Sequence, residues 1–467
     1  MGYYEGMIIK MPENAKKILD TMHEAGFEAY VVGGCVRDAL LGREPMDWDI
    51  TTNALPQDTK KLFRRTIDTG IEHGTVTVMM GKEGYEITTY RIDGKYEDSR
   101  HPSEVTFTKN LTEDMKRRDF TINAMAYNEE EGLIDKFGGV EDLNNKLIRC
   151  VGNAHERFSE DALRIMRAVR FSAQLDYSIE EETKAAIKEL APTLTKISAE
   201  RVQVELIKLL ESDHPEKFMD LYDLGITGVI LPEFDACMKT EQNNPHHIYD
   251  VGTHTVKSLG YVGNDKVLRL TMLLHDIGKP RTISTDQNGI DHFHGHAALG
   301  MKMAHDIFRR LKFDRETMDR VCNLIKYHDD RFPAEPKNVR RAINRVGVDD
   351  FPLLLDVKYA DTMAQSSYYQ KEKLAAISEI RTLYDKIMEE NNCVTLKQLA
   401  VGGKELIGLG IKPGKQIGDI LNAMLKDVID EPSHNTKEYL LEPERLKNVF
   451  MKEHEQGEEH EKTSSDN

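Results

Sequence analysis

The chain lacks the features of a secreted, disulfide-bonded or membrane-spanning protein. Its 467 residues include only five cysteines, and no two of them form a C-x-x-C pair. Such sparse cysteines fit reduced thiols inside a cell better than a disulfide framework or a cysteine zinc site. The N-terminal stretch MGYYEGMIIKMPENA has no apolar core of a signal peptide, and no apolar run approaches the length that crosses a bilayer. We therefore expect a cytoplasmic protein with no membrane partner.

The chain is too long for one hydrophobic core and is acidic overall. With 39% hydrophobic and 31% charged residues, it is expected to fold into several globular modules. The net charge of -17 opposes general attraction to nucleic acid, whose phosphates require Lys and Arg. However, acidic residues concentrate in residues 453–467, while arginines cluster at 117–118 and 157–170. This segregation predicts a disordered acidic tail and a selective RNA contact.

A glycine turn near the N-terminus has the pattern of a phosphate-binding loop. Residues 30–32 form a short apolar run that leads into Gly33 and Gly34, and a helix is predicted from Cys35. Glycines let the backbone approach phosphate oxygens, and a helix start offers unpaired N–H groups. Arg37, in the first turn of that helix, adds a charged donor fork. This combination predicts a nucleoside triphosphate site.

Paired carboxylates follow the glycine turn on a second predicted strand. Asp47 and Asp49 are two residues apart, so they project on one face, where two carboxylates can hold Mg²⁺ with the phosphates as further ligands. Alone, a Gly-Gly pair is usually a turn and an Asp-x-Asp pair a solvated strand end; their combination favours a catalytic site. Glu86, on a hairpin predicted over 75–91, is either a third carboxylate near the ions or an outward-facing strand residue.

These residues resemble a known family. The pattern GGxVRDxLLGxxxxDxD is similar to the head-domain signature of class II tRNA nucleotidyltransferases and bacterial poly(A) polymerases, within the polymerase beta superfamily. The helix predicted over 111–127 matches the family motif RRDxxINAxA and places Asp119 and Asn123 on one face. The resemblance implies that Arg118, Asp119 and Asn123 join the glycine turn in holding the triphosphate and sugar. Residues 133–151, predicted as strand, glycine turn and strand, resemble a structural element of the same head.

Residues 92–110 have no sustained period and are rich in Gly, Pro and charge, which predicts a surface loop. The resemblance implies the flexible loop that supports the switch from CTP to ATP in CCA-adding and A-adding relatives. Its full length disfavours an enzyme that adds only C.

A helix predicted from Ser159, SEDALRIMRAVRF, carries a basic stripe of Arg164, Arg167 and Arg170. An ordinary amphipathic helix with ion pairs is one interpretation. The other uses hydrogen bonding, because cytosine and adenine both present an amino donor beside a ring acceptor, whereas guanine and uracil present the reverse. Asp161 only accepts and Arg164 only donates, so this pair, on adjacent turns of one helix, would accept C and A and reject G and U. The motif EDxxR is similar to the protein template of CCA-adding enzymes.

The following helix, predicted over 197–210, resembles the neck motif ISxxRxxxE and is expected to brace the base-selecting helix. Ser198 is its predicted N-cap, and Arg201 and Glu205 are predicted to be exposed.

Histidines become frequent after residue 244, and an apolar helix delivers adjacent His275 and Asp276 in LTMLLHDIGKP. This series resembles an HD-domain metal-dependent phosphohydrolase, with Lys279 available for a phosphate oxygen. Imidazoles mixed with carboxylates suit Mg²⁺, Mn²⁺, Ni²⁺, Co²⁺ or Fe and do not identify one. The histidines at 246, 292 and 294 receive no role. The resemblance implies the ligands His254, His275, Asp276 and Asp361, with His296 and His328 as additional positions for a second ion or a phosphate.

The sequence therefore predicts an α+β protein with a polymerase-beta-like head containing a small antiparallel sheet, followed by all-helical regions. The predicted reaction is addition of C, C and A to tRNA from CTP and ATP, with hydrolysis of phosphomonoesters or 2',3'-cyclic phosphates by the HD domain. Alternatives are A-only addition or poly(A) synthesis, an HD phosphohydrolase with a non-catalytic RNA-binding head, and a non-catalytic RNA scaffold. The predicted regions are a head (1–151), a neck (152–240), an HD domain (241–370), a tRNA-binding body and tail (371–452) and an acidic disordered tail (453–467).

Overall fold

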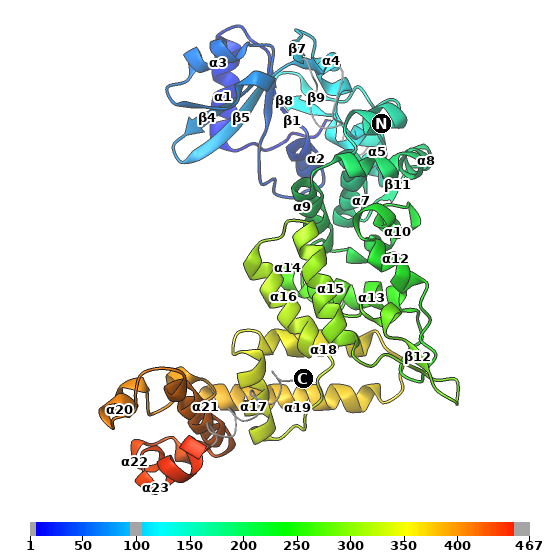
Figure 1. The fold of residues 1–467 in the computed structure, drawn as a ribbon. Coiled ribbons are helices and arrows are strands. Elements are labelled where there is room, and N and C mark those ends of the chain that lie inside the picture. Colours follow the sequence, from blue (N-terminus) through cyan, green and yellow to red (C-terminus); the bar gives the residue numbers. More distant parts are fainter. Residues whose placement is uncertain (1–5, 94–104, 453–467) are drawn as a thin grey trace. The chain divides into compact units, whose positions relative to one another are not determined.

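The computed structural model describes residues 6–93 and 105–452, and the chain forms two compact units. The first unit comprises residues up to 235 together with 309–313, and the second comprises the rest. The first unit contains a seven-stranded sheet and the second is mostly helical, which confirms the α+β prediction (Figure 1). The acidic tail and most of the loop predicted over 92–110 lie outside the described residues. Within the described part of the chain, no helix has both the length and the apolar character that crossing a membrane requires.

The central sheet of the first unit has the strand order β3-β4-β5-β2-β1-β8-β9. Its strands are β1 (Ala29–Val32), β2 (Ile50–Thr52), β3 (Thr66–Gly70), β4 (Thr75–Met80), β5 (Glu83–Thr89), β8 (Ala126–Asn128) and β9 (Gly132–Ile134). The sheet is mixed, because β2 and β5 pair in parallel while the other neighbours are antiparallel. The prediction of an antiparallel sheet is therefore wrong for this pair. A parallel pair needs a long crossover, and the 30 residues from 53 to 82 supply it.

The parallel register determines which side chains meet at one end of the sheet. Ile50 of β2 lies beside Ile87 of β5, so the preceding residues, Asp49 and Glu86, lie at the same level. Three shorter strand pairs lie outside this sheet. They are β6 (Arg91–Asp93) with β7 (Val105–Phe107), β10 (Leu147–Ile148) with β11 (Ser178–Ile179), and β12 (Ser284–Thr285) with β13 (Asp291–His292).

Short helices surround the sheet and continue into a helical region within the first unit. They are α1 (Glu13–Glu24), α2 (Gly34–Leu40), α3 (Pro56–Leu62), α4 (Leu111–Lys116), α5 (Gly139–Asn144), α6 (Ala154–Glu160), α7 (Leu163–Leu175), α8 (Glu181–Leu190), α9 (Ala199–Leu210), α10 (Phe218–Asp223), α11 (Thr227–Ile230) and α12 (Pro232–Met238). Helix α1 buries Ala15, Ile18, Leu19 and Met22, the stripe that its spacing predicts, and it packs with α3 near the sheet (Figure 1).

Two predicted elements of the head differ from the structure. The helix expected over 111–127 ends at Lys116, and the chain then forms only the 3-10 turn η2 (Thr121–Asn123). Its N-cap is Asn110, whose side chain accepts the N–H groups of Thr112 and Glu113. The turn expected after residue 137 is followed by a helix, α5, because Asp135 accepts the N–H groups of residues 139 and 140 at its start.

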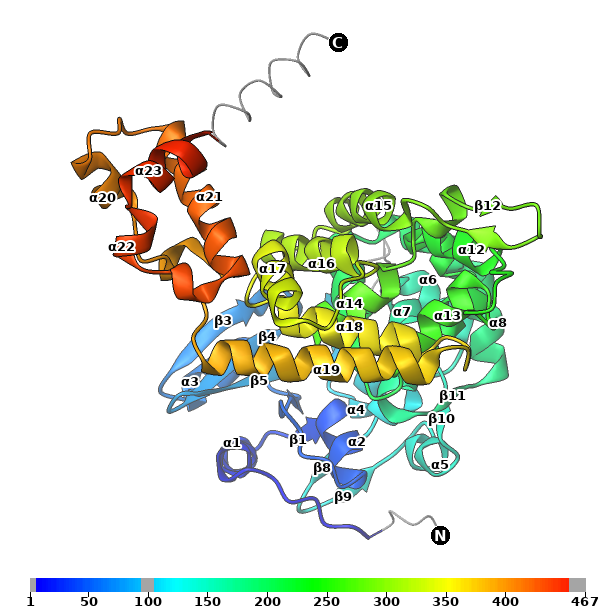
Figure 2. The ribbon, with the colours of Figure 1, turned by 90° about the horizontal axis from the view of Figure 1, so that it is seen from below.

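The second unit is mostly helical, and several of its helices are longer than any in the first unit. Its helices are α13 (Val251–Leu259), α14 (Lys266–Leu274), α15 (His296–Arg310), α16 (Arg315–Tyr327), α17 (Pro336–Val346), α18 (Phe351–Met363), α19 (Gln370–Glu389), α20 (Gly403–Gly408), α21 (Lys415–Asp430), α22 (Lys437–Leu440) and α23 (Pro443–Arg445). Helix α19, the longest, runs beside α17 and α18 (Figure 2). The C-terminal helices share a separate apolar core that includes Leu406, Met424 and Phe450.

Candidate active sites

The glycine turn of the first unit supports one side of a polar cavity. Gly33 has φ +83°, a left-handed conformation that favours glycine, and it precedes α2. Arg37, in that helix, donates from Nη1 to Asn123 Oδ1 at 2.5 Å and from Nε to Asp38 Oδ1 at 3.0 Å. Arg118 lies on the other side of the turn, since a Cβ on Gly33 would stand 3.4 Å from its Nη1. The turn and two guanidinium groups therefore face one space.

Three carboxylates lie at the end of the sheet. The prediction that Asp47 and Asp49 lie on a strand is wrong, because both residues precede β2. Both are exposed, and Trp48 between them is buried. This alternation keeps both carboxylates on one side, and Val32 N–H holds Asp49 O at 2.9 Å. Loss of solvation, then the charge of Glu86 and that of Asp47, raises the pKa of Asp49 to about 6 against the opposing effect of Arg118. This concentration of negative charge fits a divalent cation.

Asp119 connects the head motif with the helical region. It lies outside any α-helix and accepts from Asn123 Nδ2 at 3.2 Å and from Phe120 N–H at 2.7 Å. The prediction that Asp119 and Asn123 share a helix face is therefore wrong, although the two side chains do meet. Arg167 of α7 lies 2.7 Å from Asp119 Oδ2. Burial opposes ionisation of Asp119, but the charges of Arg167 and Arg164 prevail and lower its pKa to about 2.

All of the residues predicted for the head and base-selecting site line one cavity of about 800 Å³ in the first unit. They come from the glycine turn, the segment before β2, the loop around η2, and α7 with the residues before it. They are Gly33, Gly34, Arg37, Asp47, Asp49, Arg118, Asp119, Asn123, Asp161, Arg164, Arg167 and Arg170.

The prediction that Asp161 and Arg164 lie on one helix is wrong. Ser159 is inside α6 and caps nothing; Asp161 follows α6 in an extended conformation (φ −145°, ψ 105°), and α7 starts at Leu163. The helix breaks here because Asp161 Oδ1 accepts the Leu163 N–H at 3.1 Å, a local bond that competes with helix continuation. Arg164 pairs with Glu160 at 2.6 Å, and it also donates to backbone carbonyls.

Arg201 of α9 holds the Asp161 carboxylate, a contact that the sequence analysis missed. Its Nη2 lies 2.8 Å from Asp161 Oδ2 and its Nη1 lies 3.4 Å from Oδ1. Arg201 is half-buried and Glu205, four residues further, is buried, so their predicted exposure is wrong. Ser198 is the N-cap of α9 as predicted, accepting the Arg201 N–H. The sequence feature that could have indicated a role for Arg201 is its spacing from Glu205, four residues further on the same helix face.

Phe171 orders the arginines of the cavity. The guanidinium carbons of Arg37, Arg167 and Arg170 lie 5.0, 5.2 and 4.1 Å from the centre of its ring. Arg170 also donates to Glu205 Oε2 at 2.6 Å, within a pair that is almost fully buried. A helical pattern shows Phe171 only as one of the apolar residues of this helix and does not show which cations will stack on its ring.

The second unit brings the predicted HD residues together from distant parts of the chain. Donor atoms of His254, His275, Asp276 and Asp361 all lie within 4.8 Å of one another. His254 Nε2 and His275 Nε2 lie 2.8 and 3.2 Å from Asp361 Oδ1. Both histidines face backbone carbonyls through Nδ1, at 3.1 and 2.6 Å. This arrangement assigns the proton to Nδ1 and directs the Nε2 lone pair inward, as metal-ligating histidines require.

Asp276 joins a second group with His296 and His328. Its Oδ1 lies 3.4 Å from His296 Nε2 and 3.6 Å from His328 Nε2, and these two nitrogens are 3.1 Å apart. Its Oδ2 faces the first group and is buried without a well-directed hydrogen bond among the described residues. The donor set therefore fits one or two metal ions with Asp276 between them.

A cavity of about 510 Å³ opens over this cluster. Lys279 Nζ lies 3.2 Å from Asp276 Oδ2 and donates to Gln242 Oε1 at 2.7 Å, so it is held at the cavity floor. The histidines at 246, 292 and 294, which received no role, line the cavity but do not join the donor groups. His247 also lines it, and its Nδ1 is buried without a hydrogen-bond partner in the described chain.

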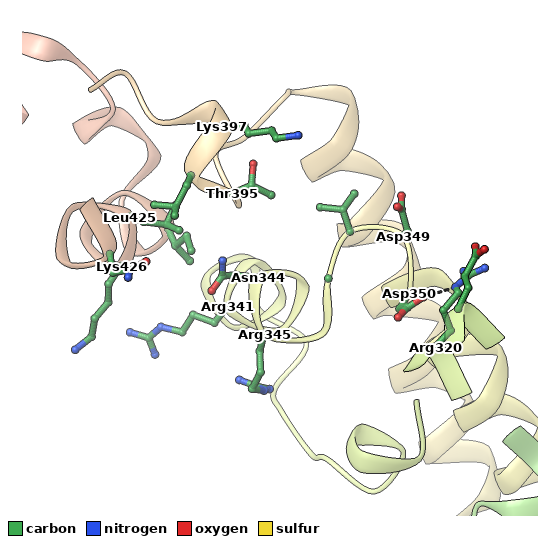
Figure 3. A pocket seen from close by; sticks show the side chains of 16 residues that line it. Arg320, Arg341, Asn344, Arg345, Asp349, Asp350, Thr395, Lys397, Leu425 and Lys426 are labelled. Carbon is green, nitrogen blue, oxygen red and sulfur yellow. Dashed lines mark hydrogen bonds and ion pairs between the residues drawn. The ribbon is translucent and has the colours of Figure 1, made fainter. Parts of the chain in front are cut away.

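Another cavity of the second unit, of about 1490 Å³, lies beside α17 and α21 (Figure 3). Arg341 of α17 lines this cavity and forms a forked ion pair, at 2.7 and 2.8 Å, with Asp430, which does not line it. Lys426 and Lys397 also line this cavity, and Arg320 is paired with Asp350 at another side of it (Figure 3). This cavity combines both signs of charge and has no group of metal donors among the described residues.

Comparison with known proteins follows the same division of the chain. Residues 29–149 match the poly A polymerase head domain, and residues 176–238 match a probable RNA and SrmB-binding site of polymerase A. Residues 246–365 match the HD domain. The first unit thus carries a nucleotidyltransferase-type head, and the metal-donor cluster lies in an HD domain.

The curated relatives compared with this chain include CCA-adding enzymes of several bacteria. The CCA-adding enzyme of Limosilactobacillus reuteri is 54% identical over 433 residues, covering 92% of this chain and 95% of that protein. The chain spans about half the length of other curated relatives it matches, such as the Enterococcus faecalis CCA-adding enzyme, with 54% identity over 42% of this chain and 49% of the relative. The crystal structure of the Bacillus stearothermophilus CCA-adding enzyme in complex with CTP has a TM-score of 0.70 at 28% identity, covering 94% and 99% of the two chains. The chain belongs to the CCA-adding enzyme family.

Proposed function

We propose that this protein adds C, C and A to the 3' end of tRNA, using CTP and ATP and releasing pyrophosphate. The observation that carries the proposal is one cavity lined by the glycine turn, the paired carboxylates and the Asp161–Arg164 segment. Membership of the CCA-adding enzyme family supports the choice of tRNA, CTP and ATP. The predicted cytoplasmic location is part of the same proposal.

The side chains of the cavity divide the work of nucleotidyl transfer. The tRNA 3'-oxygen forms a bond to the α-phosphorus, the bond to the pyrophosphate oxygen breaks, and the hydroxyl proton is released. Arg37 and Arg118 neutralise phosphate oxygens, while Asn123 fixes the position of Arg37. Mg²⁺ held by Asp47 and Asp49 would supply positive charge at the 3'-oxygen and the α-phosphate.

Base choice rests on Asp161 and Arg164, which line the same cavity although they belong to different elements. Asp161 accepts from the amino group of C or A, and Arg164 donates to the ring nitrogen beside it. The opposite pattern of G or U would place a carbonyl acceptor against Asp161 and an N–H donor against Arg164, so neither bond to the base could form. The bonds of Arg164 to Glu160 and to backbone carbonyls fix the orientation of its guanidinium group in the cavity.

We also propose the division into head (1–151), neck (152–240), HD domain (241–370) and RNA-binding body and tail (371–452). Lys397 and Lys426, which line the cavity beside α21, support RNA contact in the last region.

An incorporation assay tests the transferase proposal. Purified protein is incubated with tRNA that ends before the CCA triplet, with CTP alone, ATP alone and both together. Full CCA addition only with both nucleotides is expected, whereas use of ATP alone would instead indicate A addition or poly(A) synthesis. Asp49→Ala should abolish incorporation. The matched control is Asp68→Ala, which changes an exposed carboxylate on β3 outside the cavity.

A second activity is favoured by the donor cluster of the HD domain. We propose that this site hydrolyses phosphomonoesters or 2',3'-cyclic phosphates, with water adding to phosphorus as the ester oxygen leaves with a proton. His254, His275, Asp276 and Asp361 would hold one divalent ion, with His296 and His328 beside Asp276 for a second. The ion would activate water, and Lys279 would hold a phosphate oxygen. Mg²⁺, Mn²⁺, Ni²⁺, Co²⁺ and Fe are the candidates.

The two sites are tested against each other. Asp276→Ala should abolish hydrolysis and spare nucleotide incorporation, and Asp49→Ala should do the opposite. The control Asp319→Ala, at an exposed position of α16, should affect neither reaction. Loss of both activities from either variant, with folding intact, would refute two independent sites. Hydrolysis without incorporation in the wild-type protein would instead support a non-catalytic head.

A further inference from the structure

The cavity over the HD donor cluster has a basic side that the metal ligands do not use. Lys373, in the first turn of α19, lines it although this residue lies beyond the HD match at 246–365. Its Nζ donates to His246 Nδ1 at 3.0 Å and to Gln365 Oε1 at 2.8 Å. Gln365 Nε2 in turn donates to Asp361 Oδ2 at 3.4 Å. Lys373 is thus separated from a metal-ligand position by one glutamine side chain.

Among the described residues, the cations on this side form no close ion pair: burial lowers the pKa of Lys373, and the charges of Asp361 and Asp329, which also line the cavity, oppose that effect from a longer distance. Within residues 6–93 and 105–452, neither Lys373 nor Arg331, which also lines the cavity, has a carboxylate within the 4.0 Å of an ion pair. The partner of Lys373 is the imidazole of His246, whose pKa is lowered by burial and by Lys373 itself, so it acts as a neutral acceptor. A half-buried ammonium with only neutral partners favours an incoming anion.

An aromatic surface adjoins these cations. The Tyr368 ring lies 5.1 Å from the His246 ring in an edge-to-face arrangement, and the Tyr369 ring lies 4.4 Å from Tyr368. The two tyrosines are 46% and 56% exposed. Exposed rings beside a cationic groove are the arrangement on which nucleobases stack in single-stranded nucleic acids.

We propose that Lys373, Arg331 and Tyr368 form an anchoring subsite for the 3'-terminal nucleotide of RNA. The terminal phosphate lies over the donor cluster, the preceding phosphodiester contacts Lys373 and Arg331, and the base stacks on Tyr368. The inference rests on the proposed HD hydrolysis and narrows its substrate to RNA 3' ends that carry a phosphate. The cavity volume of about 510 Å³ is within the roughly 300–1,000 Å³ of small-ligand sites.

The test compares two substrates that differ in the groups the subsite holds. A dinucleotide with a 3'-phosphate has a base and an internal phosphodiester, whereas glycerol phosphate has neither. In Lys373→Met, KM for the dinucleotide should rise about tenfold with little change in kcat, while KM for glycerol phosphate should change less than twofold. Lys373→Arg should recover most of the loss. Tyr368→Ala should also raise KM for the dinucleotide only.

Lys371→Met, at an exposed position on the same helix, is the matched control and should behave as wild type. Calorimetric titration of the 3'-phosphorylated dinucleotide into the full chain provides a readout independent of turnover, and Lys373→Met should weaken binding by a similar factor. Equal KM changes for both substrates, or no change in dinucleotide affinity, would overturn the subsite. Absence of hydrolysis of either substrate by wild type would refute the proposed HD activity, and the titration would still decide whether the subsite exists.

Discussion

Selection of C and A should depend on Arg201, although this residue lies on α9 and the proposed base-reading residues, Asp161 and Arg164, lie before and in α7. Three donors hold the Asp161 carboxylate: two N–H groups of Arg201, at 2.8 and 3.4 Å, and the Leu163 N–H at 3.1 Å. A carboxylate offers about four acceptor positions, so about one remains for the amino group of an incoming base. Replacing Arg201 by methionine keeps side-chain length and removes both guanidinium bonds.

The magnitude follows from these contacts. A hydrogen bond to a charged group contributes about 1.5–3 kcal/mol. Here one of the two bonds is long, the paired side chains are 24% and 15% exposed, and Leu163 still holds one oxygen. We therefore expect Arg201→Met to lower the free-energy difference between correct and wrong bases by about 1.5–2 kcal/mol, which is a roughly 10- to 30-fold lower discrimination in kcat/KM. Arg201→Lys should recover part of it, because an ammonium reaches one oxygen but cannot form the fork.

The assay measures kcat/KM for single-nucleotide addition with CTP against UTP, and with ATP against GTP. Arg201→Met should lower both ratios, with a thermal unfolding midpoint that verifies the fold. Arg149→Met is the control, because it removes another arginine–carboxylate pair of the first unit, outside the cavity. Unchanged ratios in a folded Arg201→Met variant would refute the claim that Asp161 must be held in this orientation to select the base.

Other predictions concern the two cavities. Phe171→Leu removes the ring on which three guanidinium groups stack, so KM for CTP should rise about tenfold in steady-state assays, at about 0.5–1 kcal/mol per lost cation–π contact. Asp119, whose pKa is lowered to about 2 in the folded protein, stabilises the fold above about pH 4 by roughly 2 kcal/mol. This contribution should disappear as the pH falls from 4 to 2, so denaturant unfolding of wild type and Asp119→Asn should converge there. Chelation should abolish HD hydrolysis. Metal titration after chelation should show tighter binding of Ni²⁺ or Co²⁺ than of Mg²⁺, and His254→Ala should weaken the binding of Ni²⁺ and Co²⁺.

Local residue patterns together with the family resemblance located both candidate sites. The adjacent His275 and Asp276 end an apolar helix, and the resemblance to HD domains that this pattern supports adds Asp361, 86 residues from His275. The glycine turn and the paired carboxylates likewise indicated one cavity of the head. In both cases the residue types are rare in combination and are close in sequence to a predicted helix or strand end.

Pairing between elements could not be predicted in the same way. The charge of Glu205 suggested an exposed position, yet Arg170 neutralises it in a buried pair, which a single helical pattern does not reveal. Asp161 was assigned to a continuous helix because Ser159 is a good cap by residue type. The structure instead uses Asp161 itself, whose bond to Leu163 N–H ends one helix before the next.

The donor chemistry of the two sites predicts that they use different metals. The carboxylates around Asp49 supply only oxygen ligands, which suit Mg²⁺, whereas the HD cluster mixes imidazoles with carboxylates. Because imidazole favours later transition metals, the two activities should respond separately to the metal supply. Protein prepared with Mg²⁺ alone should incorporate nucleotides fully and hydrolyse phosphate esters slowly, and adding Ni²⁺ or Co²⁺ should raise hydrolysis with little effect on incorporation. A parallel response of both activities to each metal would contradict this separation.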